Sequence, residues 1–209
     1  MNQDSIGNLY ASFADLLSYP AASTFVQAET CLAQLQDSHP EVTPAFENFL
    51  RGLNQCELER LKELYTTTFD MQPVCYPYIG YQLFGESYKR GALMAQLNEA
   101  YRASGFSAGQ ELPDHLSAAL RFVGLDAANR AGEFCQSLLH SGLSPALEKM
   151  LKPFGAQSEN PYFWLLTALQ QFLSPTPEGV SYAAREASSN ATRSGRSLTS
   201  AEKEFDHAR

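Results

Sequence analysis

The sequence predicts an all-α protein, and two observations carry this prediction. Apolar residues recur at spacings of three and four through most of the first 173 residues, which places them on one face of successive helices. No segment shows the strict alternation of apolar and polar residues that is typical of a half-buried strand. The chain has 209 residues, 44% of them hydrophobic, and can bury one substantial core, so we expect a single-domain helical bundle.

Four helices are predicted in the first third of the chain. The first begins after Ser5, its expected N-cap, and stops before Pro20. Another spans about residues 22 to 36, and a third precedes Asn54, which is expected to cap the fourth. The apolar faces of the first, third and fourth helices are formed by Ile6, Leu9, Tyr10, Phe13, Leu16 and Leu17, by Phe46, Phe49, Leu50 and Leu53, and by Leu58, Leu61, Leu64, Tyr65 and Phe69.

The pattern changes between about residues 70 and 85. This stretch holds two prolines, two glycines, a cysteine and four aromatic residues without helical spacing. We expect an ordered loop, because long loops with many large apolar side chains are uncommon in compact domains and are often functional. Gly80 and Gly85 are expected to serve turns. The aromatic residues are candidates for a peptide-binding surface, since rigid rings supply contact area at low entropic cost; they are Tyr76, Tyr78, Tyr81 and Phe84.

Helical spacing resumes after this loop. A long helix is predicted from about residue 86 to 104, with Gly105 as its C-cap. Pro113 suits the first position of a further helix, which puts Asp114 in its first turn. Three more amphipathic segments complete the bundle, over residues 131–139, 147–154 and 162–173.

The composition changes again at Ser174. Beyond it, proline, serine, threonine and charged residues replace the large apolar ones. We therefore divide the chain into an all-helical domain, residues 1–173, and a polar, flexible tail, residues 174–209.

Composition disfavours several classes of function. The net charge of −8 argues against a nucleic-acid partner, which would require clustered Lys and Arg, and favours a basic partner instead. The N-terminus lacks the basic and apolar regions of a secretory signal, and no apolar run approaches the roughly 20 residues that cross a bilayer. The four cysteines are widely spaced, without a C-x-x-C pair. We therefore expect a cytoplasmic protein without direct membrane insertion.

Motifs for common cofactors and nucleophiles are absent. The sequence contains no phosphate-binding glycine loop, no dinucleotide fingerprint, no nucleophile elbow and no H-E-x-x-H. The four histidines are isolated from any familiar metal-ligand spacing. We expect no cofactor, no metal and no catalytic residue. One enzymatic alternative stays open, a small hydrolase that uses Asp114 and His115 with Cys75, provided that these groups lie within hydrogen-bond reach.

Five short elements stand in a characteristic order. They are residues 65–70 (YTTTFD), 83–85 (LFG), 90–91 (RG), 100–106 (AYRASGF) and 111–116 (ELPDHL). Together they resemble the NarJ branch of the TorD/DmsD/NarJ superfamily of molybdoenzyme assembly chaperones. The last element is the most specific, and the resemblance covers about residues 9–173.

The resemblance implies a TorD-like bundle that works by binding. Such chaperones bind the N-terminal segment of their client, the catalytic subunit of a molybdopterin oxidoreductase such as nitrate reductase or a related enzyme of the DMSO reductase family. That segment is often a twin-arginine leader or a vestige of one. The chaperone keeps the subunit competent for insertion of the molybdenum cofactor. An acidic, aromatic surface would complement a basic and apolar leader.

Eight residues form the expected client-binding site. We expect a groove between the helix from residue 86 to 104 and the helix opened by Pro113, with acidic side chains neutralising basic residues of the client. The eight are Asp70, Tyr76, Tyr78, Tyr81, Phe84, Glu111, Asp114 and His115. Asp114 and His115 also fit a purely structural role at a helix start. A permanent scaffold subunit of the reductase is a further alternative for the whole chain.

Overall fold

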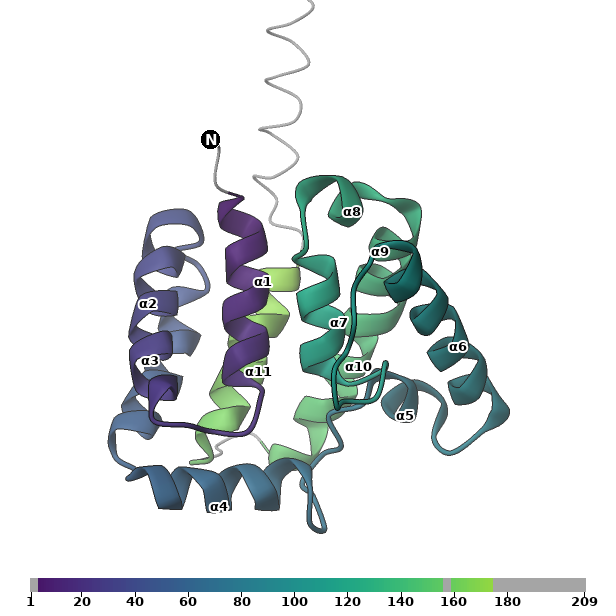
Figure 1. The fold of residues 1–209 in the computed structure, drawn as a ribbon. Helices are drawn as coiled ribbons and strands as arrows, with labels where there is room; N and C mark the ends of the chain where they lie inside the picture. The colour runs from purple at the N-terminus through teal and green to yellow at the C-terminus, as the bar shows by residue number, and fades with distance from the viewer. Residues whose placement is uncertain (1–3, 156–158, 175–209) are drawn as a thin grey trace, which may run out of the picture. The chain divides into compact units, whose positions relative to one another are not determined.

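Every regular element is a helix in the computed structural model, which describes residues 4–155 and 159–174. The prediction of an all-α fold is therefore confirmed. In chain order (Figure 1) the elements are α1 (Ser5–Leu16), α2 (Ser23–Ser38), α3 (Thr43–Asn54), α4 (Leu58–Phe69), α5 (Ile79–Phe84), α6 (Tyr88–Ala103), α7 (Leu116–Val123), α8 (Ala127–Ala131), α9 (Glu133–Ser137), the π-helix η1 (Leu138–Leu143), α10 (Ser144–Leu151), the 3-10 helix η2 (Lys152–Phe154) and α11 (Pro161–Leu173).

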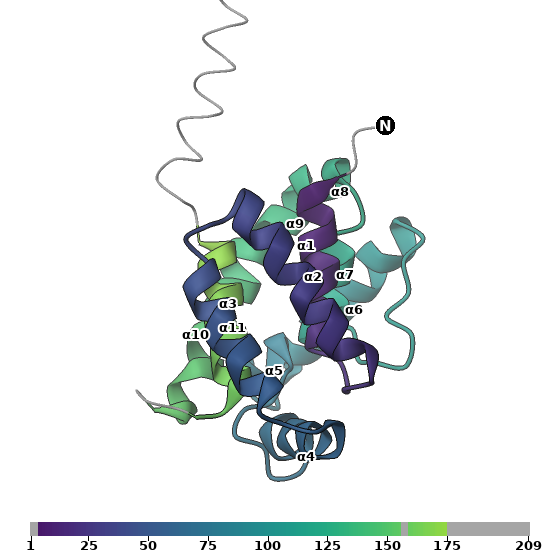
Figure 2. The same ribbon diagram turned by 90° about the vertical axis from the view of Figure 1, so that its left-hand side faces the viewer.

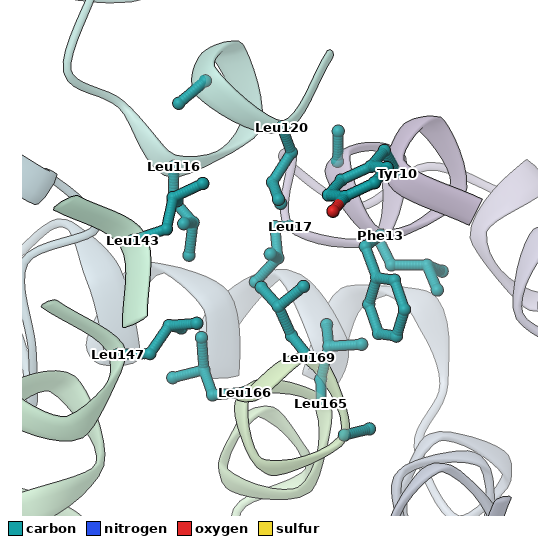
Figure 3. Close-up of a cluster of buried hydrophobic side chains, with 14 of the residues drawn as sticks. Tyr10, Phe13, Leu17, Leu116, Leu120, Leu143, Leu147, Leu165, Leu166 and Leu169 are labelled. Carbon is teal, nitrogen blue, oxygen red and sulfur yellow. The ribbon is translucent and has the colours of Figure 1, made fainter. Parts of the chain in front are cut away.

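The hydrophobic core forms where α11 meets the N-terminal helices. α11 packs on α3 and α10, while α1 packs on α2 and α7. Burial of a leucine or phenylalanine side chain stabilises the fold by about 1.5 to 3 kcal/mol before the entropic cost of ordering it. Figure 3 labels ten residues of this core, all of them buried: Tyr10, Phe13, Leu17, Leu116, Leu120, Leu143, Leu147, Leu165, Leu166 and Leu169.

α4 lies crosswise to α1 and α3. Figure 1 shows α4 running across below them, and Figure 2 shows it end-on. The rings of Tyr65 and Phe69 on its buried face lie 5.8 and 5.1 Å from the ring of Tyr162 on α11. Both residues are therefore part of the core, as the helical spacing predicts. Asp70 and the aromatic segment follow directly after the end of α4.

Two helix starts in this part of the chain differ from the prediction. Asp4 caps α1 instead of Ser5, because its carboxylate accepts a hydrogen bond from the N–H of Gly7 at 2.9 Å. Asn54 is the last residue of α3, and α4 begins only after Glu57. Serine and aspartate are comparable caps, so residue preference alone does not favour Ser5 over Asp4.

Larger differences concern the two segments that carry the predicted site. The expected loop from residue 70 to 85 contains α5, so its second half is helical. α7 begins at Leu116 and not at Pro113, so Asp114 precedes the helix instead of lying in its first turn. Both differences arise from contacts between segments that are distant in the sequence.

The compact unit that contains these helices ends at Leu173. Of the tail predicted from Ser174, only Ser174 itself lies in the described part of the chain. The boundary of the tail and its flexibility therefore stay predictions. Among the helices of residues 4–155 and 159–174, none is long and apolar enough to cross a bilayer.

Candidate functional site

A short antiparallel bridge joins the two motif segments. The backbone of Tyr78 pairs with that of His115. The N–H groups of Ile79 and Leu116 each donate a hydrogen bond across the bridge, at 2.8 Å. The backbone before Leu116 is held in an extended conformation by this pairing, which explains why α7 starts there. The bridge also brings the aromatic segment and the E-L-P-D-H-L element into one place.

A buried ion pair lies beside the bridge. Nε of Arg90 on α6 donates to Oδ2 of Asp114 at 2.8 Å, and Nη2 donates to Oδ1 at 3.4 Å. The side chain of Asp114 is 0% exposed and that of Arg90 is 15% exposed. Asp114 was predicted to neutralise basic residues of a client directly, but its carboxylate already has a cationic partner. The pair joins α6 to the segment just before α7, the two elements between which the groove was predicted.

Gly80 allows α5 to approach this ion pair. A Cβ atom at Gly80 would lie 2.8 Å from Oδ2 of Asp114 and 2.9 Å from Cγ of Arg90, both too close. Gly80 was predicted to serve a turn, yet it lies within α5 and is required by close packing. Gly85 does follow the turn prediction, because it ends α5 with φ of 63°, a conformation that favours glycine.

Two tyrosine rings lie close to the guanidinium of Arg90, and a third tyrosine packs on one of them. Its Cζ atom lies 5.1 Å from the ring centroid of Tyr78 and 5.8 Å from that of Tyr81. The ring of Tyr76 lies 4.4 Å from that of Tyr81. A cation over aromatic rings is stabilised by their quadrupoles, more strongly for arginine when it is partly desolvated. Tyr78 and Tyr81 therefore hold Arg90, whereas Tyr76 is more exposed.

His115 is buried and forms the N-cap of α7. Its Nδ1 atom accepts a hydrogen bond from the N–H of Ser117 at 3.2 Å and lies 2.7 Å from the hydroxyl of the same residue. Its Nε2 atom faces Oε2 of Glu111 at 4.0 Å. Burial lowers the pKa of His115, while the nearby carboxylates of Glu111 and Asp114 oppose that shift. The structural role that the sequence left open for His115 is the one that the geometry shows.

Asp70 and Glu111 keep exposed carboxylates at this site. The side chain of Glu111 is 50% exposed, and Asp70 is exposed at the end of α4. Burial raises the pKa of Tyr78, the charges of Glu111, Asp114 and Asp70 raise it further, and the charge of Arg90 opposes them. The two exposed acids are therefore available to an external cation.

Apolar side chains of the two segments joined by the bridge are exposed as well. Tyr76 is 39% exposed, Phe84 41% and Leu112 46%. We call Asp70, Tyr76, Phe84, Glu111 and Leu112 the acidic-apolar surface. Large exposed apolar side chains beside charged groups are typical of interaction sites. Sequence reasoning did not include Leu112 in the site.

Arg90 is the main site residue that sequence reasoning missed. It belongs to the element at residues 90–91, whose resemblance to the family implies no role for it. Arg90 is the third residue of α6, where a cation is disfavoured by the positive end of the helix dipole. An arginine at such an unfavourable position indicates that its guanidinium pairs with a carboxylate elsewhere in the fold. The later E-L-P-D-H-L element supplies two carboxylates that could be this partner.

Two observations disfavour the open hydrolase alternative without excluding it. Burial raises the pKa of the Cys75 thiol to about 12, so it is not a thiolate near neutral pH. Nδ1 of His115 is engaged in the cap of α7. Among the described residues, no group of three His, Cys, Asp or Glu side chains lies close enough to hold a metal ion.

A separate hollow of about 720 Å³ lies between α3, α4 and α11. Its lining includes Arg51, Arg60 and Trp164. None of the eight predicted site residues lines it. It therefore adds nothing to the site around the bridge.

Comparison with known proteins identifies the family. Residues 32–162, more than half of the chain, match the family model of the nitrate reductase delta subunit. A solved structure from Archaeoglobus fulgidus, of a protein with a proposed role in redox enzyme maturation, is similar with a TM-score of 0.53. The two share 20% sequence identity over 83% of this chain and 96% of that one, which supports a common fold.

No curated protein matches the chain in sequence. The family match spans the region from α2 to the start of α11 and includes both segments joined by the bridge. The chain therefore belongs to the nitrate reductase delta subunit family, a family of redox enzyme maturation chaperones.

Proposed function

We propose that this chain is a cytoplasmic chaperone that binds the N-terminal segment of a molybdoenzyme catalytic subunit. The client is a nitrate reductase or a related enzyme of the DMSO reductase family, and binding keeps it competent for insertion of the molybdenum cofactor. Family membership supports the chaperone role, and the acidic-apolar surface is the observation that supports the kind of partner. The chaperone contributes no cofactor or metal of its own.

The chemistry of this surface favours a peptide with both basic and apolar residues. Asp70 and Glu111 supply two exposed negative charges, and the chain as a whole carries a net charge of −8. Tyr76, Phe84 and Leu112 offer apolar area whose removal from water contributes about 25 cal/mol per Å². A twin-arginine leader, with its basic pair and apolar stretch, has both features.

Moderate affinity is expected, since a chaperone must release its client. The two acids are exposed, so each contact with an arginine is screened by water and by salt. The apolar side chains are only partly exposed in the free chain, which limits the additional area that a peptide can bury. These features favour reversible binding.

Calorimetric titration tests the proposal. The probe is a synthetic peptide that carries two adjacent arginines followed by an apolar stretch. We expect Asp70→Asn and Glu111→Gln each to weaken binding by about two- to fivefold, equivalent to about 0.4 to 1 kcal/mol, and the loss to shrink at higher ionic strength. Glu29→Gln removes an exposed charge on α2, outside the surface, and serves as the matched control. Equal affinity in all three variants and the parent chain rules out this surface as the binding site.

A further inference from the structure

The first turn of α6 breaks several preferences of helix starts. Its N-cap, Ser87, makes no side-chain capping hydrogen bond, and the turn contains no acidic residue. Lys89 and Arg90 instead place two cations at the positive end of the helix dipole. Local rules that fail together in one segment are expected at functional sites.

Gly91 weakens the same turn further. Glycine in a helix interior is less favourable than alanine, because it loses more backbone entropy on folding. A Cβ atom at Gly91 would meet nothing within 4 Å, so packing does not require glycine there. The start of α6 is therefore intrinsically easy to unwind.

Contacts made by the rest of α6 do not depend on this turn. Leu97 and Tyr101, in its second half, are the buried residues of the helix. The hydroxyl of Tyr101 donates to the carbonyl oxygen of Pro113 at 2.8 Å. The first turn, in contrast, is held mainly by the side chain of Arg90. Its release would leave the second half of α6 anchored.

The cradle that holds Arg90 has the features of a site for arginine. A fully buried carboxylate, Asp114, accepts two hydrogen bonds from the planar fork of the guanidinium. Two aromatic rings, of Tyr78 and Tyr81, lie within 6 Å of its charge. Gly80 leaves the space that Oδ2 of Asp114 and Cγ of Arg90 occupy. A lysine could not reproduce this geometry, because its ammonium group lacks the fork.

We infer that this cradle, formed by Asp114, Tyr78, Tyr81 and Gly80, is an arginine-binding site whose resident is Arg90 and whose second occupant is an arginine of the client. The inference rests on the proposed function. When the client binds at the adjacent acidic-apolar surface, the first turn of α6 unwinds at Gly91 and a client arginine takes the place of Arg90. Exchange of one guanidinium for another keeps the buried carboxylate paired throughout, so no uncompensated charge is created.

A test without any client uses the variant Arg90→Ala and methylguanidinium as the probe. We expect the variant to melt at a lower temperature than the parent chain, and low concentrations of methylguanidinium to raise its melting temperature in a saturable manner. Methylammonium, which has the charge without the fork, should have no such effect. The double variant Arg90→Ala with Asp114→Asn should lose the rescue. Absence of rescue in the single variant overturns the inference.

A second test leaves Arg90 in place and is informative even when Arg90→Ala does not fold. Gly91→Ala strengthens the first turn of α6, so unwinding becomes harder and the peptide with two arginines should bind about fivefold more weakly. A peptide with both arginines replaced by lysine should not distinguish Gly91→Ala from the parent chain. Equal or tighter binding of the arginine peptide to Gly91→Ala overturns the inference.

The two tests separate failure of the inference from failure of the proposed function. If the arginine peptide binds to the parent chain but neither variant behaves as expected, the cradle is purely structural and the proposed function stands. If the peptide does not bind at all, the proposed function and the exchange both fall, even where methylguanidinium shows that the cradle accepts a free guanidinium.

Discussion

At the scale of single residues, His115 links protonation to the start of α7. The N–H of Ser117 can only donate, so Nδ1 of His115 must be unprotonated to accept from it. Burial lowers the pKa of His115, and Arg121 lowers it further, against the raising effects of Glu111 and Asp114. The folded chain therefore favours the neutral ring, with its proton on Nε2.

The stability of the chain should fall as the pH is lowered through the histidine range. The unfolded chain takes up a proton near the ordinary histidine pKa of about 6.5, whereas folded His115 takes it up only at lower pH. The free energy of unfolding should thus decrease below about pH 6.5, until the folded ring also titrates. His115→Asn keeps a competent cap and removes this titration, so urea unfolding of the variant should depend less steeply on pH.

His39 does not affect the comparison between the parent chain and His115→Asn. Burial lowers its pKa too, so it adds a similar pH dependence to the parent chain and the variant. The difference between the two slopes of unfolding free energy against pH therefore measures the contribution of His115. Identical slopes in the two proteins would contradict the role assigned to the neutral ring.

Asp114 should matter far more for stability than a helix cap does. Asp114→Asn leaves the guanidinium of Arg90 without its counterion, and breaking a buried pair in this way costs about 3 to 5 kcal/mol in free energy of unfolding. Arg60→Gln removes an exposed pair with Glu63 and should change the stability little. Equilibrium denaturation measures both. If Asp114→Asn lowers the free energy of unfolding by only a few tenths of a kcal/mol, Asp114 contributes no more than a helix cap does.

At the scale of elements, the placement of α5 against the ion pair depends on one glycine. Gly80→Ala would put a methyl group 2.8 Å from Oδ2 of Asp114, so α5 must shift, at a cost of about 1 to 3 kcal/mol. Gly91→Ala has free space and should stabilise the chain by about 0.5 to 1 kcal/mol. Thermal melting should therefore show opposite changes for the same substitution at the two positions. Changes in the same direction would contradict this account of α5.

Helices with long apolar faces could be predicted from the sequence. α1 and α11 span twelve and thirteen residues, enough for the spacing of three and four to repeat several times. α5 has only six residues and offers no such repeat. Its position depends on the bridge between Tyr78 and His115, which joins segments far apart in the chain. Local patterns do not contain that information.

The candidate site could be predicted only in part for the same reason. The family resemblance pointed to the two segments that the bridge joins, and the client-binding role of their residues remains a prediction. The position of Arg90 at the start of α6 signals a partner but does not identify Asp114, which lies 24 residues later and outside any helix. Asp70, Tyr76, Phe84 and Glu111 stay exposed and available.

At the scale of the whole molecule, the apolar spacing that builds the core ends at Leu173. We therefore expect removal of Ser181–Arg209 to leave folding and peptide affinity nearly unchanged. Thermal melting and titration of the shortened chain measure both quantities. An insoluble product, or a tenfold loss of affinity, about 1.4 kcal/mol, would show that the C-terminal segment takes part in folding or binding.

A chaperone and a permanent subunit differ in when they are bound to the reductase. The family is named after a subunit of nitrate reductase. A maturation chaperone should bind the catalytic subunit before the cofactor is inserted and should then leave. A scaffold should remain in the active enzyme.

Affinity capture of this chain from cells that make a molybdenum-containing reductase distinguishes a maturation chaperone from a permanent subunit. The captured material is assayed for the reductase catalytic subunit and for molybdenum, and the purified active reductase is assayed for this chain. The chaperone account predicts capture of the catalytic subunit without stoichiometric molybdenum, and no chain in the active enzyme. Stoichiometric amounts of this chain in the active, molybdenum-loaded reductase would contradict it.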